Sequence, residues 1–361
     1  MNKINNPYAT LNYNECVDLI EKIGQQVSVL IRGPIGCGKS SMLKELAKRF
    51  PDHVPIYVDI TLVDMGDFLL PKMTTIDGVE VCKFVPNSTL GFHLGKPIIL
   101  MFDEITKGSK SVQNMALRMF LEHKLGEYAL PEGSIVFATG NLASEGVGDV
   151  MAAHANNRIC NVTLRKPSPA EWRFDFAEHN GVDPVVIATV LEYPECLASP
   201  TDYERPEQNN YIQDARAPRA SFVTPRSLEK ASDVLKACRD LDESVLTHAL
   251  IGVVGEKFAM DLLMVLRLDN TLPSFASIVA NPETAKISKS GASVCLIVSK
   301  LLGNCTKDNF DAVMQYLDRL PREAQALFMR GVMSSNSPKR PIAVQNRAFT
   351  EKCVALGFLF S

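Results

Sequence analysis

The residues with the clearest chemical role lie in one short stretch, residues 28–41, which reads SVLIRGPIGCGKSS. An apolar run over 27–31 leads into Gly-x-x-x-x-Gly-Lys-Ser, and a helical pattern, MLKELAKRF, follows. Glycines at this spacing let successive backbone N–H groups turn inward and bind phosphate at a helix N-terminus. The ammonium group of Lys39 would reach the β- and γ-phosphates, and the hydroxyl group of Ser40 would bind Mg²⁺. The stretch therefore predicts a nucleoside-triphosphate site built from Gly33, Pro34, Gly36, Cys37, Gly38, Lys39, Ser40 and Ser41.

Two carboxylates follow a second apolar run. Residues 98–102, IILMF, are continuously apolar, which is typical of a strand buried on both faces of a parallel sheet, and Asp103 and Glu104 come next. The carboxyl ends of such strands are where α/β sheets bind ligands. We expect Asp103 to hold Mg²⁺ through the water shell of the metal, and Glu104 to orient and polarise the attacking water. Together with the phosphate loop, this acidic pair predicts hydrolysis of the nucleotide.

A polar residue also ends the next apolar run. Residues 135–138 predict a strand that closes on Thr139-Gly140-Asn141. In that position Asn141 would lie beside the γ-phosphate and hold the attacking water together with Glu104. The alternative is an ordinary asparagine in a turn, which composition alone favours.

The elements that must position these residues follow from hydrophobic periodicity. Strand patterns at 27–31, 54–60, 98–102, 135–138 and 159–164 alternate with helical patterns over the first half of the chain. The second half is helical from Pro225 onward. The sequence thus predicts an α/β fold, a parallel sheet flanked by helices, followed by an all-helical lid and a C-terminal helical extension. Helices are expected at 13–24, 42–50, 112–120, 167–181, 225–238, 243–266, 291–303, 307–319 and 321–333.

An Asp-Gly pair at 77–78 lies between two β-prone runs and predicts a β-hairpin before the acidic strand. This hairpin would be an insertion in the nucleotide-binding fold. It is either a surface excursion or a loop that faces a central pore or a partner.

The predicted domain organisation has four parts. Residues 1–180 form the α/β nucleotide-binding domain, 181–222 a connecting helix and an exposed loop, 223–280 the helical lid, and 281–361 the C-terminal extension. The segment 194–222 is rich in Pro, Asn and charged residues, so we expect a solvated loop. Trp172 is expected to be a packing anchor.

The composition limits the classes of partner. A formal charge of −3 gives no general attraction to nucleic acid or to a membrane surface. Nine cysteines are scattered singly with no C-x-x-C pair, which favours reduced thiols over a disulfide framework or a zinc site. No apolar run reaches the ~18 residues of a membrane span, and the N-terminus has no apolar signal core. We expect a cytoplasmic protein.

As a set, these motifs resemble the AAA+ ATPases, and within them the MoxR-like group. The similar segments are GPIGCGKSS, FDEITK with QNMALRMFLE, LPEGSIVFATGN, TPRSLEKA and the DGVEVCKFVP hairpin, and the resemblance covers roughly residues 10–260. It implies an oligomeric ATP hydrolase, a hexameric ring or spiral, that uses ATP and Mg²⁺ to remodel or mature a protein partner in a chaperone-like way. It also implies a partner with a von Willebrand factor A domain. The alternative is a nucleic-acid-associated AAA+ motor or clamp-loader-like ATPase, which the acidic balance disfavours.

The resemblance also assigns roles to arginines. Arg158 precedes the last core strand, where the family keeps the arginine finger that reaches the γ-phosphate of a neighbouring subunit. The family usually has Asp-Arg-Phe at this point and this chain has Asn-Arg-Ile, so Arg165 stays an alternative finger. Arg226, in TPRS, matches the sensor-two arginine that opens a lid helix and touches the nucleotide of its own subunit.

Overall fold

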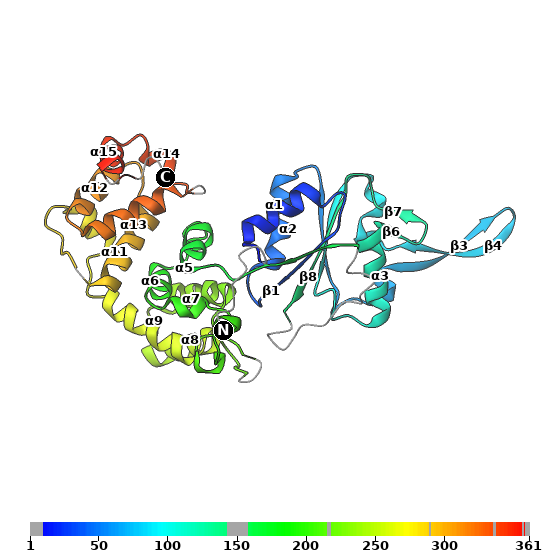
Figure 1. The fold of residues 1–361 in the computed structure, drawn as a ribbon, viewed down its shortest axis with the longest axis horizontal. Coiled ribbons are helices and arrows are strands. Elements are labelled where there is room, and N and C mark those ends of the chain that lie inside the picture. Colours follow the sequence, from blue (N-terminus) through cyan, green and yellow to red (C-terminus); the bar gives the residue numbers. More distant parts are fainter. Residues whose placement is uncertain are drawn as a thin grey trace. The chain divides into compact units, whose positions relative to one another are not determined.

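The computed structural model describes residues 10–142, 158–214, 218–288, 290–334, 337–355 and 357. The chain forms two compact units, Met1–Lys166 and Pro167–Ser361 (Figure 1). The predicted boundary at residue 180 and the finer division of the helical half remain predictions.

The first unit is built on a parallel sheet with the strand order β2-β5-β8-β1-β9. The phosphate-loop strand β1 therefore lies between β8 and β9, and the acidic strand β5 lies between β2 and β8. All five strands end at the same edge because they run parallel, so the polar residues that follow them converge there. The strands are β1 (Val29–Gly33), β2 (Val54–Asp59), β5 (Ile98–Asp103), β8 (Ile135–Asn141) and β9 (Cys160–Thr163).

Helices cover both faces of this sheet (Figure 1). Alternate residues of β5 point to opposite faces, and both sets are buried. On one face the core contains α1 (Tyr13–Ile23) and α2 (Met42–Arg49), and on the other it contains α3 (Lys110–Glu122). The continuous apolarity of residues 98–102 follows from this two-sided burial.

The predicted hairpin is present as β3 (Leu69–Ile76) and β4 (Val79–Pro86), which extend away from the sheet (Figure 1). Asp77 and Gly78 both have positive φ, 52° and 81°, as a two-residue hairpin turn requires. A second, small hairpin pairs β6 (Lys124–Leu125) with β7 (Tyr128–Ala129). The Asp-Gly pair was sufficient to predict this hairpin because the conformation of a two-residue turn depends on the turn residues themselves.

The second unit is helical in its described residues and has two hydrophobic clusters. One cluster joins α6, α7, α8 and α9, and the other joins α11 to α15. Among the described residues no helix is both long and apolar enough to cross a membrane. The helices are α5 (Pro169–Glu171), α6 (Pro184–Glu192), α7 (Pro225–Cys238), α8 (Glu243–Val254), α9 (Glu256–Asp269), α10 (Phe275–Ala280), α11 (Gly291–Asn304), α12 (Phe310–Asp318), α13 (Arg322–Met333), α14 (Arg340–Ala343) and α15 (Arg347–Ala355).

The long helical pattern at 243–266 is two helices. Gly255 separates α8 from α9 with φ of 82°, which an L side chain rarely adopts. The predicted helix at 167–181 is likewise divided, with α5 continuing as a π-helix over Trp172–Ala177. Trp172 is buried in the first cluster, so its expected role as a packing anchor is confirmed.

The expectation of an exposed loop over 194–222 is wrong for much of that segment. Cys196, Leu197, Tyr211 and Ile212 are buried, because they pack into the same cluster as α6 and α9. Arg219 then ties the segment together by donating hydrogen bonds to three of its backbone carbonyl groups. The polar composition of the segment did not reveal that these few apolar residues are buried.

Candidate functional site

The phosphate loop has the backbone conformation that anion binding requires. Gly36 and Gly38 adopt positive φ of 71° and 83°, so successive N–H groups turn toward one side of the loop. A Cβ atom on Gly33 would lie 2.9 Å from the Cβ atom of Leu164, so this position needs a glycine for close packing beside β9. The loop runs through a short 3₁₀ turn, Lys39–Ser41, into α2.

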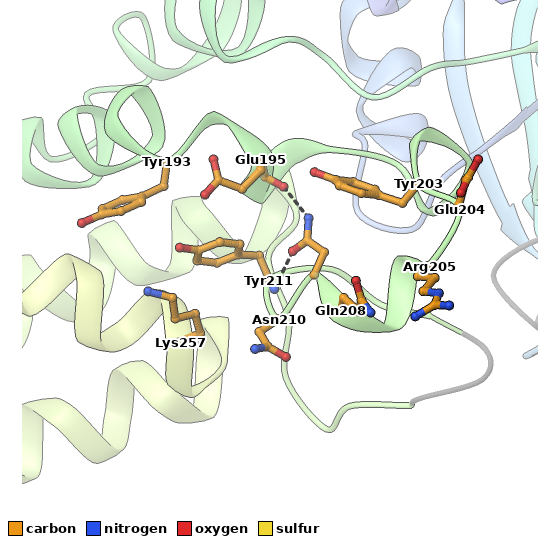
Figure 2. A pocket seen from close by; sticks show the side chains of 10 residues that line it. Tyr193, Glu195, Tyr203, Glu204, Arg205, Gln208, Asn210, Tyr211 and Lys257 are labelled. Carbon is orange, nitrogen blue, oxygen red and sulfur yellow. Dashed lines mark hydrogen bonds between the residues drawn. The ribbon is translucent and has the colours of Figure 1, made fainter. Parts of the chain in front are cut away.

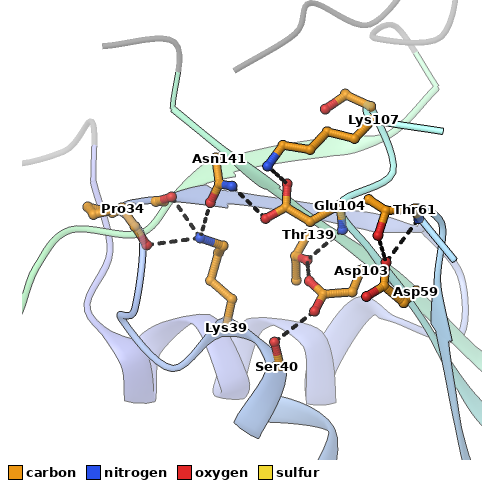
Figure 3. A network of polar contacts seen from close by, with 12 residues as sticks. Pro34, Lys39, Ser40, Asp59, Thr61, Asp103, Glu104, Lys107, Thr139 and Asn141 are labelled. Carbon is orange, nitrogen blue, oxygen red and sulfur yellow. Dashed lines mark hydrogen bonds and ion pairs between the residues drawn. The ribbon is translucent and has the colours of Figure 1, made fainter. Parts of the chain in front are cut away.

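The ammonium group of Lys39 is buried at the centre of the loop (Figure 3). Its Nζ donates to the carbonyl oxygens of Gly33 and Pro34, at 2.8 and 2.9 Å, and to Oδ1 of Asn141 at 2.8 Å. Lys39 and Asn141 are 102 residues apart, and the pairing of β1 with β8 places Gly33 directly beside Asn141. The structure thus brings the predicted phosphate-binding lysine and the predicted sensing asparagine into contact.

Three hydroxyl groups converge on the carboxylate of Asp103. Ser40 and Tyr57 each donate to Oδ2 at 2.8 Å, and Thr139 donates to Oδ1. Asp103 is only 8% exposed, so these donors replace water around a buried negative charge. Sequence reasoning found Ser40 but missed Tyr57 and Thr139. The one available signal was the position of both residues near the carboxyl ends of predicted strands.

Glu104 lies in the turn immediately after β5, with a positive φ of 54°. Asn141 Nδ2 donates to its Oε1 at 2.5 Å, and Lys107 Nζ lies 3.2 Å from Oε2 as an ion pair outside hydrogen-bond geometry. Figure 3 shows the resulting chain of side chains, Lys39 to Asn141 to Glu104 to Lys107. The predicted water-activating acid, sensing residue and phosphate-binding lysine therefore form one network. Sequence reasoning missed Lys107.

The donor set fits a magnesium ion. Ser40 supplies a hydroxyl oxygen 2.8 Å from a carboxylate oxygen of Asp103, and Mg²⁺ prefers such oxygen ligands, few in number, while it keeps several waters. Across the described residues no cluster of three or more His, Cys, Asp or Glu side chains offers a site made by protein ligands alone. In the predicted roles, Ser40 and Asp103 would contribute two of the oxygen ligands of the metal.

Arg158 does not lie beside the loop of its own chain. It precedes β9, whose first residue, Cys160, pairs with Val29 at the start of β1, whereas the loop follows the end of β1. Arg158 is exposed and borders a hollow of about 500 Å³ along α3. The other lining residues of this hollow are Met65, Ser111, Asn114, Met115, Leu117, Arg118 and Leu121.

Arg165 follows the opposite end of β9, at the same sheet edge as the loop. It is half-buried, its backbone N–H donates to the carbonyl oxygen of Leu11, and its Nη1 donates to that of Lys166 at 3.3 Å. Arg226 is exposed in the first turn of α7, which belongs to the other compact unit. The roles of all three arginines remain predictions.

A second hollow, of about 620 Å³, lies in the helical unit (Figure 2). Lys257 Nζ lies 5.6 Å from the ring centroids of both Tyr193 and Tyr211 and donates to Asp261, which also accepts from the Tyr211 hydroxyl. Burial and the hydrogen bond to Asp261 raise the pKa of Tyr211, so its phenol stays protonated. This hollow contains none of the predicted site residues. Its remaining lining residues are Glu195, Tyr203, Glu204, Arg205, Gln208, Asn209 and Asn210.

No protein-family model and no curated protein sequence matches this chain. Among solved structures, it is similar to a protein of Cytophaga hutchinsonii described as a candidate ATPase, at 14% identity, over 69% of this chain and 83% of that one, with a TM-score of 0.33. It is also similar to the RuvB Holliday junction branch migration motor of Thermotoga maritima, at 15% identity, over 74% of each chain, with a TM-score of 0.36.

These structural similarities are too weak to identify the fold, which is established by the strands and helices of this chain. The parallel sheet with its glycine loop, flanking helices and following helical unit confirms the predicted α/β fold with a helical C-terminal region. The AAA+ and MoxR-like assignments remain predictions.

Proposed function

We propose that this chain is an AAA+ ATPase that works as an oligomer and couples ATP hydrolysis to remodelling of a protein partner. One observation carries the proposal: the carboxylate of Glu104 is joined through Asn141 to the ammonium group of Lys39, beside the pair formed by Ser40 and Asp103. A site that only bound nucleotide would need the loop and the lysine, but it would not need a carboxylate poised at the phosphate end.

Each residue has a distinct task in this proposal. The loop N–H groups and Lys39 bind the phosphates and neutralise charge that develops on the transferred phosphoryl group. Glu104 accepts a proton from the attacking water, and Asn141 keeps the carboxylate beside the phosphate that Lys39 contacts. Ser40 and Asp103 would hold Mg²⁺, which would supply positive charge to offset the negative charge of the phosphates.

The position of Arg158 supports an assembly. It lies at the sheet edge away from the loop of its own chain, so it can serve a nucleotide only in a neighbouring copy. A hexameric ring or spiral is the arrangement that the AAA+ resemblance implies. The MoxR-like resemblance further suggests a protein partner with a von Willebrand factor A domain and a cytoplasmic location.

Glu104→Gln tests the hydrolysis step. The amide keeps the size of the side chain but cannot act as a base, so we expect turnover to fall by roughly a hundredfold or more, while binding of a fluorescent ATP analogue stays within about threefold of wild type. Glu122→Gln, on the exposed end of α3, is the matched control and should leave both quantities unchanged. Equal turnover in wild type and Glu104→Gln would refute the assignment of the base.

Mixing variants tests the assembly. Chains carrying Arg158→Ala keep Glu104, and chains carrying Glu104→Gln keep Arg158, so each is inactive alone but a mixed oligomer contains some complete sites. We expect activity to appear on mixing, and the same experiment with Arg165→Ala to give no such recovery. No recovery with Arg158→Ala would contradict its action across subunits.

Stimulation assays test the partner class. A protein with a von Willebrand factor A domain, encoded beside this chain, should raise ATP turnover. Stimulation by double-stranded DNA that weakens steeply with salt would instead favour a nucleic-acid motor.

A further inference from the structure

The turn that carries Glu104 is fixed by its own backbone contacts. The N–H of Ile105 donates to the carbonyl oxygen of Thr139 at 3.1 Å, and the N–H of Lys107 donates to that of Glu104 at 2.8 Å. The side-chain amide of Gln113 donates to two further carbonyl oxygens of this turn, at 2.6 and 2.9 Å. The backbone therefore places the Lys107 side chain over Glu104, and the contact does not depend on a mobile surface loop.

The carboxylate of Glu104 is held at both oxygens. Asn141 donates to Oε1, and the ammonium group of Lys107 lies 3.2 Å from Oε2. The Lys107 and Glu104 side chains are 31% and 21% exposed, so the pair is only partly screened by water. A carboxylate offers about four lone-pair sites and the Asn141 amide takes one of them, so lone pairs remain for a water molecule.

We propose that Lys107 is a positioning residue for the proposed hydrolysis reaction. By holding Oε2 while Asn141 holds Oε1, it fixes the plane of the carboxylate and so the direction in which the remaining lone pairs of Glu104 point. Proton transfer depends on this direction, because a general base must lie within hydrogen-bond reach of the water it activates. The inference rests on the proposed function, since it needs Glu104 to act as the base.

Removing the side chain tests this role. In Lys107→Ala the carboxylate keeps only the Asn141 contact, so we expect kcat for ATP hydrolysis to fall about three- to tenfold, with KM for ATP unchanged within about twofold. Lys107→Arg retains a cation within reach and should recover most of the loss. Lys110→Ala removes the same charge from the exposed first residue of α3 and should leave kcat unchanged.

A double-variant cycle separates positioning from a structural role. If Lys107 acts through Glu104, then Lys107→Ala should cause no further loss of turnover in a Glu104→Gln background. An equal loss in both backgrounds, an unchanged or raised kcat in Lys107→Ala, or an equal loss in Lys110→Ala would overturn the inference. A wild-type chain that bound the ATP analogue but failed to hydrolyse ATP would instead refute the proposed function, and the two failures are therefore distinguishable.

Discussion

Removing the hydroxyl group of Thr139 tests whether the hydrogen bonds around Asp103 stabilise the site. Thr139 is fully buried, and its hydroxyl group donates to Oδ1 of Asp103, which is itself 8% exposed. The hydroxyl oxygen of Thr139 also accepts a weak hydrogen bond from the N–H of Glu104 at 3.4 Å. Thr139→Val keeps the shape of the side chain and removes both hydrogen bonds. Because the site is buried, the carboxylate of Asp103 and the N–H of Glu104 cannot bind water in place of the lost hydroxyl group.

The magnitude follows from the charge on the acceptor. A hydrogen bond to a charged group contributes about 1.5–3 kcal/mol, and both partners here are buried. We therefore expect Thr139→Val to lower the free energy of unfolding of the first unit by about 2 kcal/mol, roughly a 30-fold change in its opening equilibrium. ATP turnover should fall as well, because Asp103 loses one of the three hydroxyl donors that orient it.

Thr189→Val is the matched control. Thr189 is also fully buried, but its hydroxyl group donates to the carbonyl oxygen of Val185 one turn earlier in α6, at 2.7 Å. This acceptor is uncharged, so the loss should be about 1 kcal/mol or less. Turnover should not change.

Hydrogen exchange read by mass spectrometry suits the measurement, because a chain with two compact units need not unfold in one step. Peptides from β8 report the first unit and peptides from α6 report the second. If Thr139→Val left the protection of β8 within about 0.5 kcal/mol of wild type, the hydroxyl group would not be the donor that orients Asp103.

Two further predictions concern stability. Gly255→Ala should lower the melting temperature, since the new Cβ atom would lie 2.7 Å from the carbonyl oxygen of Ser221 at a φ of 82°. Gly252→Ala, with open space around the new Cβ atom inside α8, should instead stabilise the helix by about 0.5–1 kcal/mol. Equal melting temperatures for the two variants would contradict this geometry. Burial lowers the pKa of His123 from its usual 6.5, so the unfolded chain binds a proton that the folded chain does not, and the free energy of unfolding should fall as the pH drops below about 6.5. In a pH series of unfolding free energies, His123→Asn should reduce this pH dependence, whereas the control His93→Gln, at an exposed position, should leave it unchanged. An unchanged pH dependence in His123→Asn would refute the role of His123 in it.

Much of the site could be predicted because its chemistry is local in sequence. The phosphate loop needs glycines, a lysine and a hydroxyl within eight residues, and the Asp-Gly turn sets the register of its hairpin without help from the rest of the chain. Asp103, Glu104 and Asn141 were found by the same reasoning, since each follows a recognisable buried strand.

The segment 194–222 could not be predicted from composition. Its few apolar residues, such as Leu197 and Ile212, stand among polar neighbours, and only packing against the helical cluster makes them anchors. A composition average cannot identify which two or three side chains of a polar stretch are buried.

The sequence alone determined which residues are candidates to bind phosphate and to carry charge, because those functions need particular side chains at fixed local spacings. The tertiary structure decided which of them meet. Tyr57 and Thr139 reach Asp103 only because β5 lies between β2 and β8, and Lys39 reaches Asn141 only because β8 pairs with β1. Strand order and register are non-local: they are set by how whole faces of the sheet are covered by helices, and no short pattern in the chain encodes them.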